Sequence, residues 1–311
     1  MAKKWLTVLL PVYKAGHDLH LAIQSILNQT HADFEFLIID DFSPDNSAAI
    51  IEEYAKKDSR IRAIYHDANC GLARTLNEGL NAASFNLVVR MDQDDESLPH
   101  RLERQLAFME ENLEVAVAGS HVYHMGAKTS YDRLVETPSS YEEIKNILPQ
   151  YNPMYHPSVI LRRDVILAMG GYRIEFKNAE DYDLWLRVSQ KHKMANIPEP
   201  LIRYRFTTTG MTLGRKWEQL YYVCLAQVAH QKRDASMQLI HDEAKIMHDK
   251  INRAEFLNIV AVGTVKELVS LRMWLGSFSV ARTFSGDIGI QSSIRLLIYI
   301  AKSLIGMKVE L

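Results

Sequence analysis

The sequence predicts an α/β fold with a mostly parallel central sheet, helices on both faces of that sheet, and a helical C-terminal extension. Over the first hundred residues, continuous apolar runs of strand length alternate with segments of helical period. Acidic residues follow two of these runs at their carboxyl ends, and strand signals fade from about residue 215. Strands that are apolar on both faces and alternate with helices indicate a parallel sheet covered on both sides.

The first half of the domain is expected to contain four strands separated by three helices. Strands are predicted at residues 6–10, where Pro11 ends the run, and at 34–39, 61–65 and 87–89. The first helix follows from Leu19 and Ile23, which are spaced for one helical face. The second is expected to open at Ser43-Pro44, an N-cap followed by proline, and to run through residue 57. The third follows Gly71.

The second half is more mixed, and three parts of the chain are predicted overall. Helices are expected at 101–111 and 180–190, strands near 115–122 and 158–161, and only helices from about 215. Residues 1–96 form the first half of the expected domain, and 97–212 form its second half. Residues 213–311 form the helical extension.

Composition excludes several classes of protein. The 311 residues include 47% apolar and 24% charged residues, enough for a substantial core and against disorder. A net charge of −2 argues against a generally basic nucleic-acid binder. Two cysteines make no disulfide framework, so a reducing cytoplasm is the expected location. The N-terminus lacks the long apolar stretch of a signal peptide.

Three carboxylates stand directly after the fourth predicted strand, at Asp92, Asp94 and Asp95. Residues i and i+2 of an extended chain point to the same side, so Asp92 and Asp94 are expected to converge. A cation between them would offset their repulsion, and oxygen ligands suit Mg²⁺ or Mn²⁺. An acidic surface turn is the alternative interpretation of these residues. Ligands of parallel sheets lie beyond the carboxyl ends of the strands, where Asp40-Asp41 also falls.

Motifs spread over roughly residues 5–210 give the chain a close resemblance to inverting family 2 glycosyltransferases of the GT-A fold. In order they are Leu10-Pro11-Val12-Tyr13, Ser25-Ile26-Leu27-Asn28-Gln29-Thr30, Ile38-Ile39-Asp40-Asp41-Phe42-Ser43-Pro44-Asp45, Asn69-Cys70-Gly71-Leu72-Ala73, Arg90-Met91-Asp92-Gln93-Asp94-Asp95, His156-Pro157-Ser158, Gly170-Gly171-Tyr172 and Ala179-Glu180-Asp181-Tyr182-Asp183-Leu184-Trp185-Leu186-Arg187. Each motif alone is weak, and their order makes the set specific. The last hundred residues carry no such match.

The resemblance implies a nucleotide-sugar donor and a divalent cation, Mn²⁺ or Mg²⁺. It makes residues 1–96 the nucleotide-sugar-binding half of the domain and 97–212 the acceptor-binding half. Asp94 is the implied metal ligand, with Asp92 as a second, while Asp92 and Asp95 would contact the donor's ribose or sugar or orient metal-bound water. A cation that bridges the diphosphate stabilises the charge of the leaving group.

The resemblance also implies which residues hold the nucleotide. Asp41, with Asp40 beside it, is the implied contact to the base, because a carboxylate can accept the N3–H of uracil. Pro11 and Tyr13 would line the same place, with Tyr13 stacked on the base. Helix-start charge is the alternative role for Asp40-Asp41. Arg205 is expected either to contact a phosphate of the donor or to form a surface salt bridge.

The acid pair Glu180-Asp181 is implied to act on the acceptor. Asp181 would be the general base, since inversion needs one base opposite the leaving group. Asn178 is the expected N-cap, which puts Asp181 at the third helical position, where the helix dipole lowers a carboxylate's pKa. Burial or nearby acids would have to oppose that effect. The alternative for Asp181 is a simple helix-start charge.

Two further residues are assigned to the acceptor side. His156 is either structural or a substrate contact, and Trp185 either flanks the acceptor or belongs to the core. A histidine that the family often carries after Tyr204-Arg205 is replaced here by Phe206. This departure puts a third protein ligand of the metal in doubt.

The C-terminal extension suggests a membrane contact or a protein contact. Residues 215–311 carry 13 Lys and Arg against 9 Asp and Glu. Within 290–305, Ser292, Arg295, Tyr299 and Lys302 form one polar stripe on an otherwise aliphatic helix that is too short to span a bilayer. The helix would lie on the inner face of the cell membrane, or pack against the catalytic domain or a second subunit of a homo-oligomer.

The sequence as a whole predicts a metal-dependent, inverting glycosyltransferase that uses a UDP-linked sugar. Its expected acceptor is a surface glycan or a polyprenyl-linked glycan precursor at the cytoplasmic face of the membrane. A sugar nucleotidyltransferase would show a Gly-rich basic loop after the first strand, and Pro11-Val12-Tyr13-Lys14 is not one. The sequence also lacks the G-x-G-x-x-G motif of NAD-dependent enzymes, which argues against that class. A degenerate glycan-binding or scaffolding relative would lack Asp94 or Asp181, and both are present.

Overall fold

The computed structural model describes residues 5–126, 132–206, 213–253, 256 and 260. The chain divides into two compact units, one made of Met1–Tyr123 with Leu134–Tyr204 and the other of His124–Arg133 with Arg205–Leu311. The predicted three-part division at residues 96 and 212 stays a prediction.

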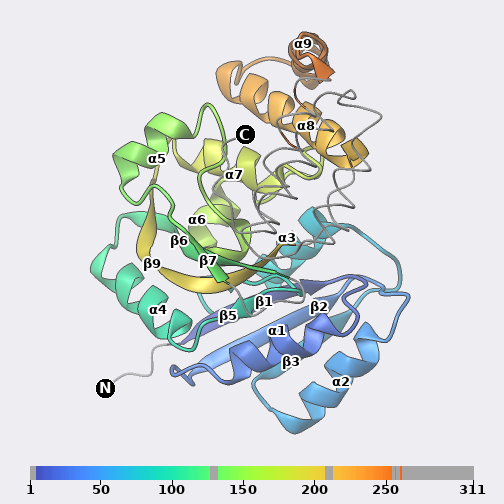
Figure 1. Ribbon diagram of the computed structural model, residues 1–311, viewed down its shortest axis with the longest axis vertical. Coiled ribbons are helices and arrows are strands. Elements are labelled where there is room, and N and C mark those ends of the chain that lie inside the picture. Colours follow the sequence, from blue (N-terminus) through green and yellow to red (C-terminus); the bar gives the residue numbers. More distant parts are fainter. Residues whose placement is uncertain (1–4, 127–131, 207–212, 254–255, 257–259, 261–311) are drawn as a thin grey trace, which may run out of the picture. The chain divides into compact units, whose positions relative to one another are not determined.

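Strands of the chain join one nine-stranded sheet in the order β3-β2-β1-β4-β8-β6-β9-β5, with β7 paired to β6 (Figure 1). Their bounds are β1 Leu6–Val12, β2 Phe34–Asp40, β3 Ile61–Tyr65, β4 Leu87–Arg90, β5 Glu96–Ser97, β6 Val115–Gly126, β7 Asp132–Val135, β8 Ile160–Arg162 and β9 Lys193–Phe206. The pairs among β3, β2, β1 and β4 are parallel, whereas β8 pairs antiparallel with both β4 and β6.

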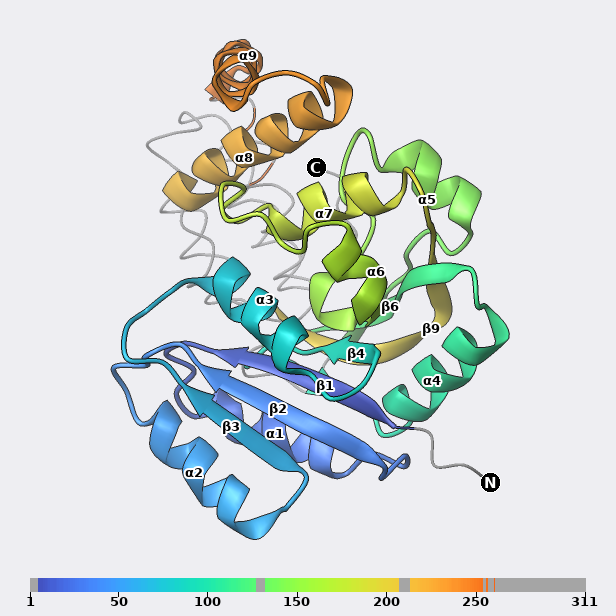
Figure 2. The ribbon, with the colours of Figure 1, turned by 180° about the vertical axis from the view of Figure 1, so that it is seen from behind.

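Helices cover both faces of the parallel part of the sheet. Figure 2 shows α3 on one face of β1 and β2, with α1 and α2 on the other. The helices of this unit are α1 Asp18–Leu27, α2 Ser47–Lys57, α3 Leu72–Ala82, α4 Arg101–Glu111, α5 Tyr141–Ile147, the 3-10 turn η1 His156–Ser158, α6 Arg163–Ala168 and α7 Glu180–Val188. The fully buried side chains of β1 and β2 form the centre of its core.

Two details of the first strands differ from the sequence prediction. Pro11 lies inside β1, because the pairing of β1 with β4 ends at Leu9 and the missing N–H of Pro11 interrupts no bond there. The predicted N-cap at Ser43-Pro44 is wrong, since α2 begins at Ser47 after Asn46. Ser43 instead accepts a hydrogen bond from the Lys14 backbone N–H at 3.0 Å, and so ties together the two loops that follow β1 and β2.

The second unit contains the helices α8 Leu213–Gln231 and α9 Met237–Asp249. Ser236 caps α9 by accepting the N–H of Leu239. The two helices pack through aromatic and histidine contacts, with Tyr221 Oη 2.8 Å from His241 Nδ1. No helix in the described ranges is long and apolar enough to cross a membrane. Residues 290–305 lie outside the described residues.

Candidate functional site

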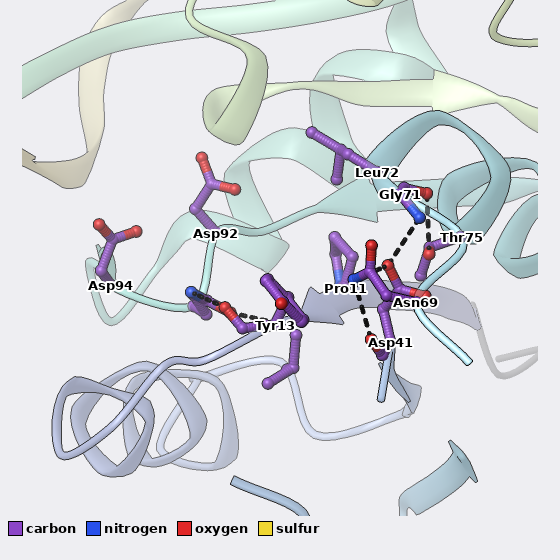
Figure 3. A pocket seen from close by; sticks show the side chains of 11 residues that line it. Pro11, Tyr13, Asp41, Asn69, Gly71, Leu72, Thr75, Asp92 and Asp94 are labelled. Atoms are coloured by element: carbon purple, nitrogen blue, oxygen red, sulfur yellow. Dashed lines mark hydrogen bonds between the residues drawn. The ribbon is translucent and has the colours of Figure 1, made fainter. Parts of the chain in front are cut away.

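A cavity of about 350 Å³ opens where β1, β2 and β4 end. Its walls come from these strand ends and from the first turn of α3, and consist of Pro11, Val12, Tyr13, Asp41, Asn69, Gly71, Leu72, Thr75, Asp92, Gln93 and Asp94. Figure 3 shows Asp92 and Asp94 on one side, Asp41, Asn69 and Gly71 on the other, and Tyr13 between them. The structure thus brings together Pro11, Tyr13, Asp41, Asp92 and Asp94, whose functional roles stay predictions.

Asp41 is saturated with hydrogen bonds from the loop before α3. Its Oδ1 accepts the backbone N–H of Cys70 at 2.7 Å, and its Oδ2 accepts the N–H of Gly71 at 2.8 Å and the Asn69 side chain at 2.9 Å. Gly71 has φ +84°, a backbone conformation that suits glycine and turns this N–H toward the carboxylate. Asp41 therefore shapes the pocket wall, and a base N–H would add a further bond to an occupied carboxylate.

His66 supplies the fourth partner of Asp41 and was not singled out from the sequence. Its Nδ1 lies 2.7 Å from Asp41 Oδ1, and its Nε2 lies 2.9 Å from Glu78 Oε2. Partial burial lowers the pKa of His66, but the hydrogen bonds to the two carboxylates raise it by more. The pKa of His66 therefore lies above its ordinary value. Two carboxylates on one imidazole favour its protonated form, in which both ring nitrogens donate.

Asp41, His66 and Cys70 hold potential metal-ligand atoms within 4.8 Å of one another. The Asp41 lone pairs at this point already accept four N–H groups. A cation would have to displace these donors, so this group fits a metal less well than the carboxylates on the opposite wall.

The loop after β4 presents Asp92 and Asp94 to the cavity and turns Asp95 inward. Asp95 is 1% exposed and does not line the cavity, whereas Asp92 and Asp94 do. Gln93 between them accepts the Tyr13 N–H at 2.7 Å and donates to the Tyr13 carbonyl at 3.0 Å. Two cavity-facing carboxylates on a braced loop are a donor set that fits Mg²⁺ or Mn²⁺.

Of the other predicted donor-side residues, Asp40 is 3% exposed and lies beside the cavity wall without lining it. Its Oδ2 accepts the N–H of Ser43 at 3.2 Å, while its buried Oδ1 has no hydrogen-bond partner within the described ranges. Arg205 belongs to the second compact unit, and its phosphate contact stays a prediction.

The acid pair begins α7, one residue earlier in the helix than predicted. Asn178 has φ +61° and is not the N-cap, because α7 starts at Glu180 after Ala179, and Asp181 is its second residue. Asp181 Oδ2 accepts the side-chain N–H of Asn152 at 2.8 Å, and Oδ1 accepts the N–H of Tyr182 at the same distance. The carboxylate is thereby fixed in orientation and remains partly exposed.

Burial decides the ionisation of this pair. Burial, and then the charge of Asp181, raises the pKa of Glu180 to about 7. Burial also raises the pKa of Asp181, although hydrogen bonds and the positive charge of Arg90 oppose the rise. Burial therefore outweighs the helix-start effect that lowers a carboxylate's pKa, as a general base in this position requires.

The predicted acceptor-side residues pack beside the acid pair. His156 Nε2 lies 2.9 Å from the Tyr172 hydroxyl, and the His156 ring meets the Trp185 ring edge-on at 6.0 Å. Burial, with the charge of Arg90, holds the pKa of His156 well below its usual range, so the ring is neutral. Trp185 is fully buried. Neither residue lines the cavity beside Asp92 and Asp94.

Comparison with known proteins identifies the family. The model of a family described as "Glycosyl transferase family 2" matches residues 7–169. The chain belongs to glycosyl transferase family 2. A curated relative, the O-antigen biosynthesis glycosyltransferase WbnJ of Escherichia coli, is 32% identical over 226 residues, which are 70% of this chain and 85% of the relative.

Solved structures of low sequence identity show the same fold. S. aureus TarS 1–349, in complex with UDP-GlcNAc, aligns with a TM-score of 0.58 at 15% identity, covering 99% of this chain and 93% of that one. The mannosyltransferase PcManGT of Pyrobaculum calidifontis, in complex with GDP-Man and Mn²⁺, aligns with a TM-score of 0.58 at 14% identity, covering 96% and 80%. The predicted GT-A fold with further C-terminal helices is confirmed.

In this glycosyltransferase, four residues to which the sequence assigned no role of their own support the predicted ones. His66 and Asn69 bond to Asp41, Gln93 braces the loop after β4, and Asn152 orients Asp181. His66 follows directly on β3, at the same sheet edge as Asp41, and that position was a usable signal. The others act across 28 to 80 residues of chain, and no local pattern marks such contacts.

The raised pKa of Glu180 predicts that the free energy of unfolding falls as pH rises. Its pKa is about 7 in the folded glycosyltransferase against 4.5 for the free side chain, so the folded state binds the proton more tightly. Stability is therefore fully present below about pH 4.5 and falls as pH rises to about 7. We expect Glu180→Gln to raise the free energy of unfolding at pH 8 by roughly 2–3 kcal/mol.

Urea unfolding of both proteins at pH 5 and pH 8 measures this difference. The gain from Glu180→Gln should be small at pH 5 and large at pH 8. A gain of the same size at both pH values would show that the substitution acts through packing and not through the carboxylate's charge.

Proposed function

We propose that this glycosyltransferase is inverting and metal-dependent and moves a sugar from a UDP-linked donor to a glycan or polyprenyl-linked glycan. The observation that carries the proposal is the presence of two sites that differ in their chemistry. One is a cavity with Asp92 and Asp94 facing Asp41 and Tyr13. The other is an acid pair, Glu180-Asp181, whose pKa values are raised toward those of a general base.

On the donor side, Asp94 and Asp92 would hold Mg²⁺ or Mn²⁺. The cation would stabilise the negative charge that collects on the diphosphate as it leaves. Tyr13 is 47% exposed at the edge of the cavity, which leaves its ring available for stacking on a nucleobase. Asp41 would border the base, while its four acceptor positions hold the loop before α3 and His66 in place.

On the acceptor side, Asp181 removes the proton of the attacking hydroxyl. The acceptor oxygen forms its bond to the anomeric carbon as the bond from that carbon to the phosphate oxygen breaks, and one displacement inverts the configuration. The proton ends on an Asp181 carboxylate oxygen, and the electron pair leaves with the diphosphate. Asn152 keeps the carboxylate aimed through the step, which is the reason for its contact at 2.8 Å.

The choice of UDP and of a surface glycan rests on relatives of this chain. The O-antigen biosynthesis relative supports a role in making a surface polysaccharide. One structural neighbour binds UDP-GlcNAc and another GDP-Man with Mn²⁺, so the donor panel below includes sugars linked to both nucleotides. A cytoplasmic location and membrane attachment through residues 290–305 stay predictions, as does a homo-oligomer.

A donor panel tests the proposal directly. Purified enzyme with Mn²⁺ is offered UDP-, GDP- and dTDP-sugars together with lipid-linked and free glycan acceptors, and release of the nucleotide diphosphate is measured. We expect UDP release from at least one UDP-sugar, dependent on both acceptor and cation. Release only from a GDP-sugar would contradict the UDP assignment. Nucleotide binding without release from any donor would favour a scaffolding role.

A further inference from the structure

Gly171 and Tyr172 belong to a sequence motif to which the proposed mechanism gives no task. Both lie in the loop that leads from α6 to the acid pair at the start of α7. Tyr172 is buried, with 3% of its surface exposed. Helix α6 packs beside α3, whose first turn lines the cavity (Figure 2). The loop is therefore placed to connect the wall of the cavity with the helix that carries the acid pair.

Asn77 of α3 binds the backbone of Tyr172 through both groups of its side-chain amide. Its Nδ2 donates to the Tyr172 carbonyl at 2.7 Å, and its Oδ1 accepts the Tyr172 N–H at 2.8 Å. Asn77 stands two residues after Thr75, which is part of the cavity wall. Two hydrogen bonds from one side chain fix both the distance and the orientation of the Tyr172 backbone relative to α3.

The close approach of Asn77 explains why a glycine stands at position 171. A Cβ atom on Gly171 would lie 2.4 Å from Asn77 Oδ1, so the amide would have to move. Gly171 also has φ +62°, a left-handed conformation that favours glycine over other residues. Glycine is therefore the residue that lets Asn77 reach the Tyr172 backbone.

Arg187 of α7 binds the same loop. Its Nη2 donates to the Gly171 carbonyl at 2.6 Å, and its Nη1 donates to the Met169 carbonyl at 2.5 Å. Asp183, on the same helix, accepts Arg187 Nε at 2.9 Å and so fixes the guanidinium. Because Arg187 and Asp181 belong to one helix, a shift of this loop should move the carboxylate that is proposed as the base.

The side chain of Tyr172 makes a second connection to α7. Its hydroxyl lies 2.9 Å from His156 Nε2, and the His156 ring meets the Trp185 ring of α7 at 6.0 Å. Trp185 is fully buried, which leaves it little room to move. Two paths of direct contacts thus run from this loop to α7, one through Arg187 and one through His156.

We propose that Asn77 is a positioning residue that sets the distance between the donor cavity and the base. It holds the backbone of Gly171 and Tyr172 against α3, and that backbone holds α7, the helix of Asp181. The inference rests on the proposed function, because it assigns Asp181 the task of a base. An in-line displacement needs the base, the acceptor hydroxyl and the anomeric carbon in one fixed geometry, so a small shift of α7 lowers the rate.

Asn77→Ala tests this role, because it removes both bonds to Tyr172 and changes no residue of the cavity wall. We expect kcat to fall by about 10-fold, while the Kd for UDP with Mn²⁺ and the KM for the donor stay within about twofold. The kcat is expressed per UDP-binding site, counted by calorimetric titration. A merely structural Asn77 would reduce the number of UDP-binding sites and leave the kcat of each site unchanged.

Asn81→Ala is the matched control. Asn81 stands one turn further along α3, where its side chain donates to the Asn77 carbonyl at 2.8 Å within the helix. This variant should keep kcat per site within about twofold of wild type.

Gly171→Ala breaks the same contact from its other side and also serves if Asn77→Ala does not fold. The added methyl group would displace the Asn77 amide, so kcat per site should again fall by about 10-fold with UDP affinity unchanged. When Asn77→Ala and Gly171→Ala are combined, the amide is already gone, and the double variant should lose no more than the larger single loss. Single losses that multiply in the double variant would show that the two residues act independently and would overturn the inference.

The outcomes separate this inference from the proposed function. A normal kcat per UDP-binding site in both Asn77→Ala and Gly171→Ala overturns the inference while leaving the glycosyltransferase mechanism in place. A loss confined to UDP affinity also overturns it, and would make Asn77 a support of the donor cavity alone. If wild-type enzyme transfers no sugar from any donor, the proposed function fails and takes this inference with it.

Discussion

Asp181→Asn is expected to abolish sugar transfer, with a loss of about 10³-fold or more in kcat. The amide keeps the shape of the side chain but cannot take the proton of the acceptor hydroxyl. Affinity for UDP with Mn²⁺ should stay within a few fold of wild type, because Asp181 does not line the donor cavity. Turnover with a saturating donor and calorimetric titration with UDP measure the two effects.

Asp164→Asn is the matched control, since Asp164 is also an acid in the first turn of a helix, α6. It should leave turnover within about twofold of wild type. A large loss of UDP affinity in Asp181→Asn, with an intact fold by circular dichroism, would make Asp181 a structural or donor-binding residue. Full activity of the variant would move the base to another group, and Glu180 would be the first candidate.

Asp94→Asn should lower transfer by about 10²-fold, comparable to the loss of one preorganised electrostatic group. The substitution removes a charged oxygen from the cavity wall that faces Tyr13 and Asp41. The concentration of Mn²⁺ needed for half-maximal activity should rise as well. EDTA should remove the activity of the wild type, and added Mn²⁺ or Mg²⁺ should restore it.

Glu111→Gln on the exposed end of α4 removes one negative charge without touching the cavity, and we expect wild-type behaviour from it. Undiminished activity of the wild type in EDTA would refute the metal assignment outright. An Asp94→Asn enzyme with normal turnover and normal Mn²⁺ dependence would transfer that role to Asp92.

The parallel half of the sheet could be read from the sequence because its signals are local. β2 and β3 begin where the apolar runs begin, and helix α4 has the bounds predicted for it. Strand β9 was missed, because Pro198 and Pro200 lie within it and proline normally argues against a strand. Its pairing with β5, from Ile202 to Arg203, lies beyond both prolines, so their missing N–H groups interrupt none of those bonds.

The candidate site was predictable wherever an acid follows a strand. Asp41, Asp92 and Asp94 belong to this class, because the carboxyl ends of parallel strands meet at one edge. The residues that fix the geometry of these acids could not be predicted, since Gln93 bonds to Tyr13 across 80 residues of chain. The direction of the Asp181 pKa also needed the structure, because burial and the helix start act against each other there.

The paired hydrogen bonds between Gln93 and the Tyr13 backbone have a consequence for altering specificity. The Gln93 amide joins the segment proposed to contact the nucleobase to the segment proposed to hold the cation, so a shift of one segment should also move the other. A laboratory-evolved change of base preference that shifts the Tyr13 loop should therefore alter which divalent ion works best. Libraries that randomise residues 12–14 and 92–94 together should yield working variants more often than libraries that randomise either segment alone.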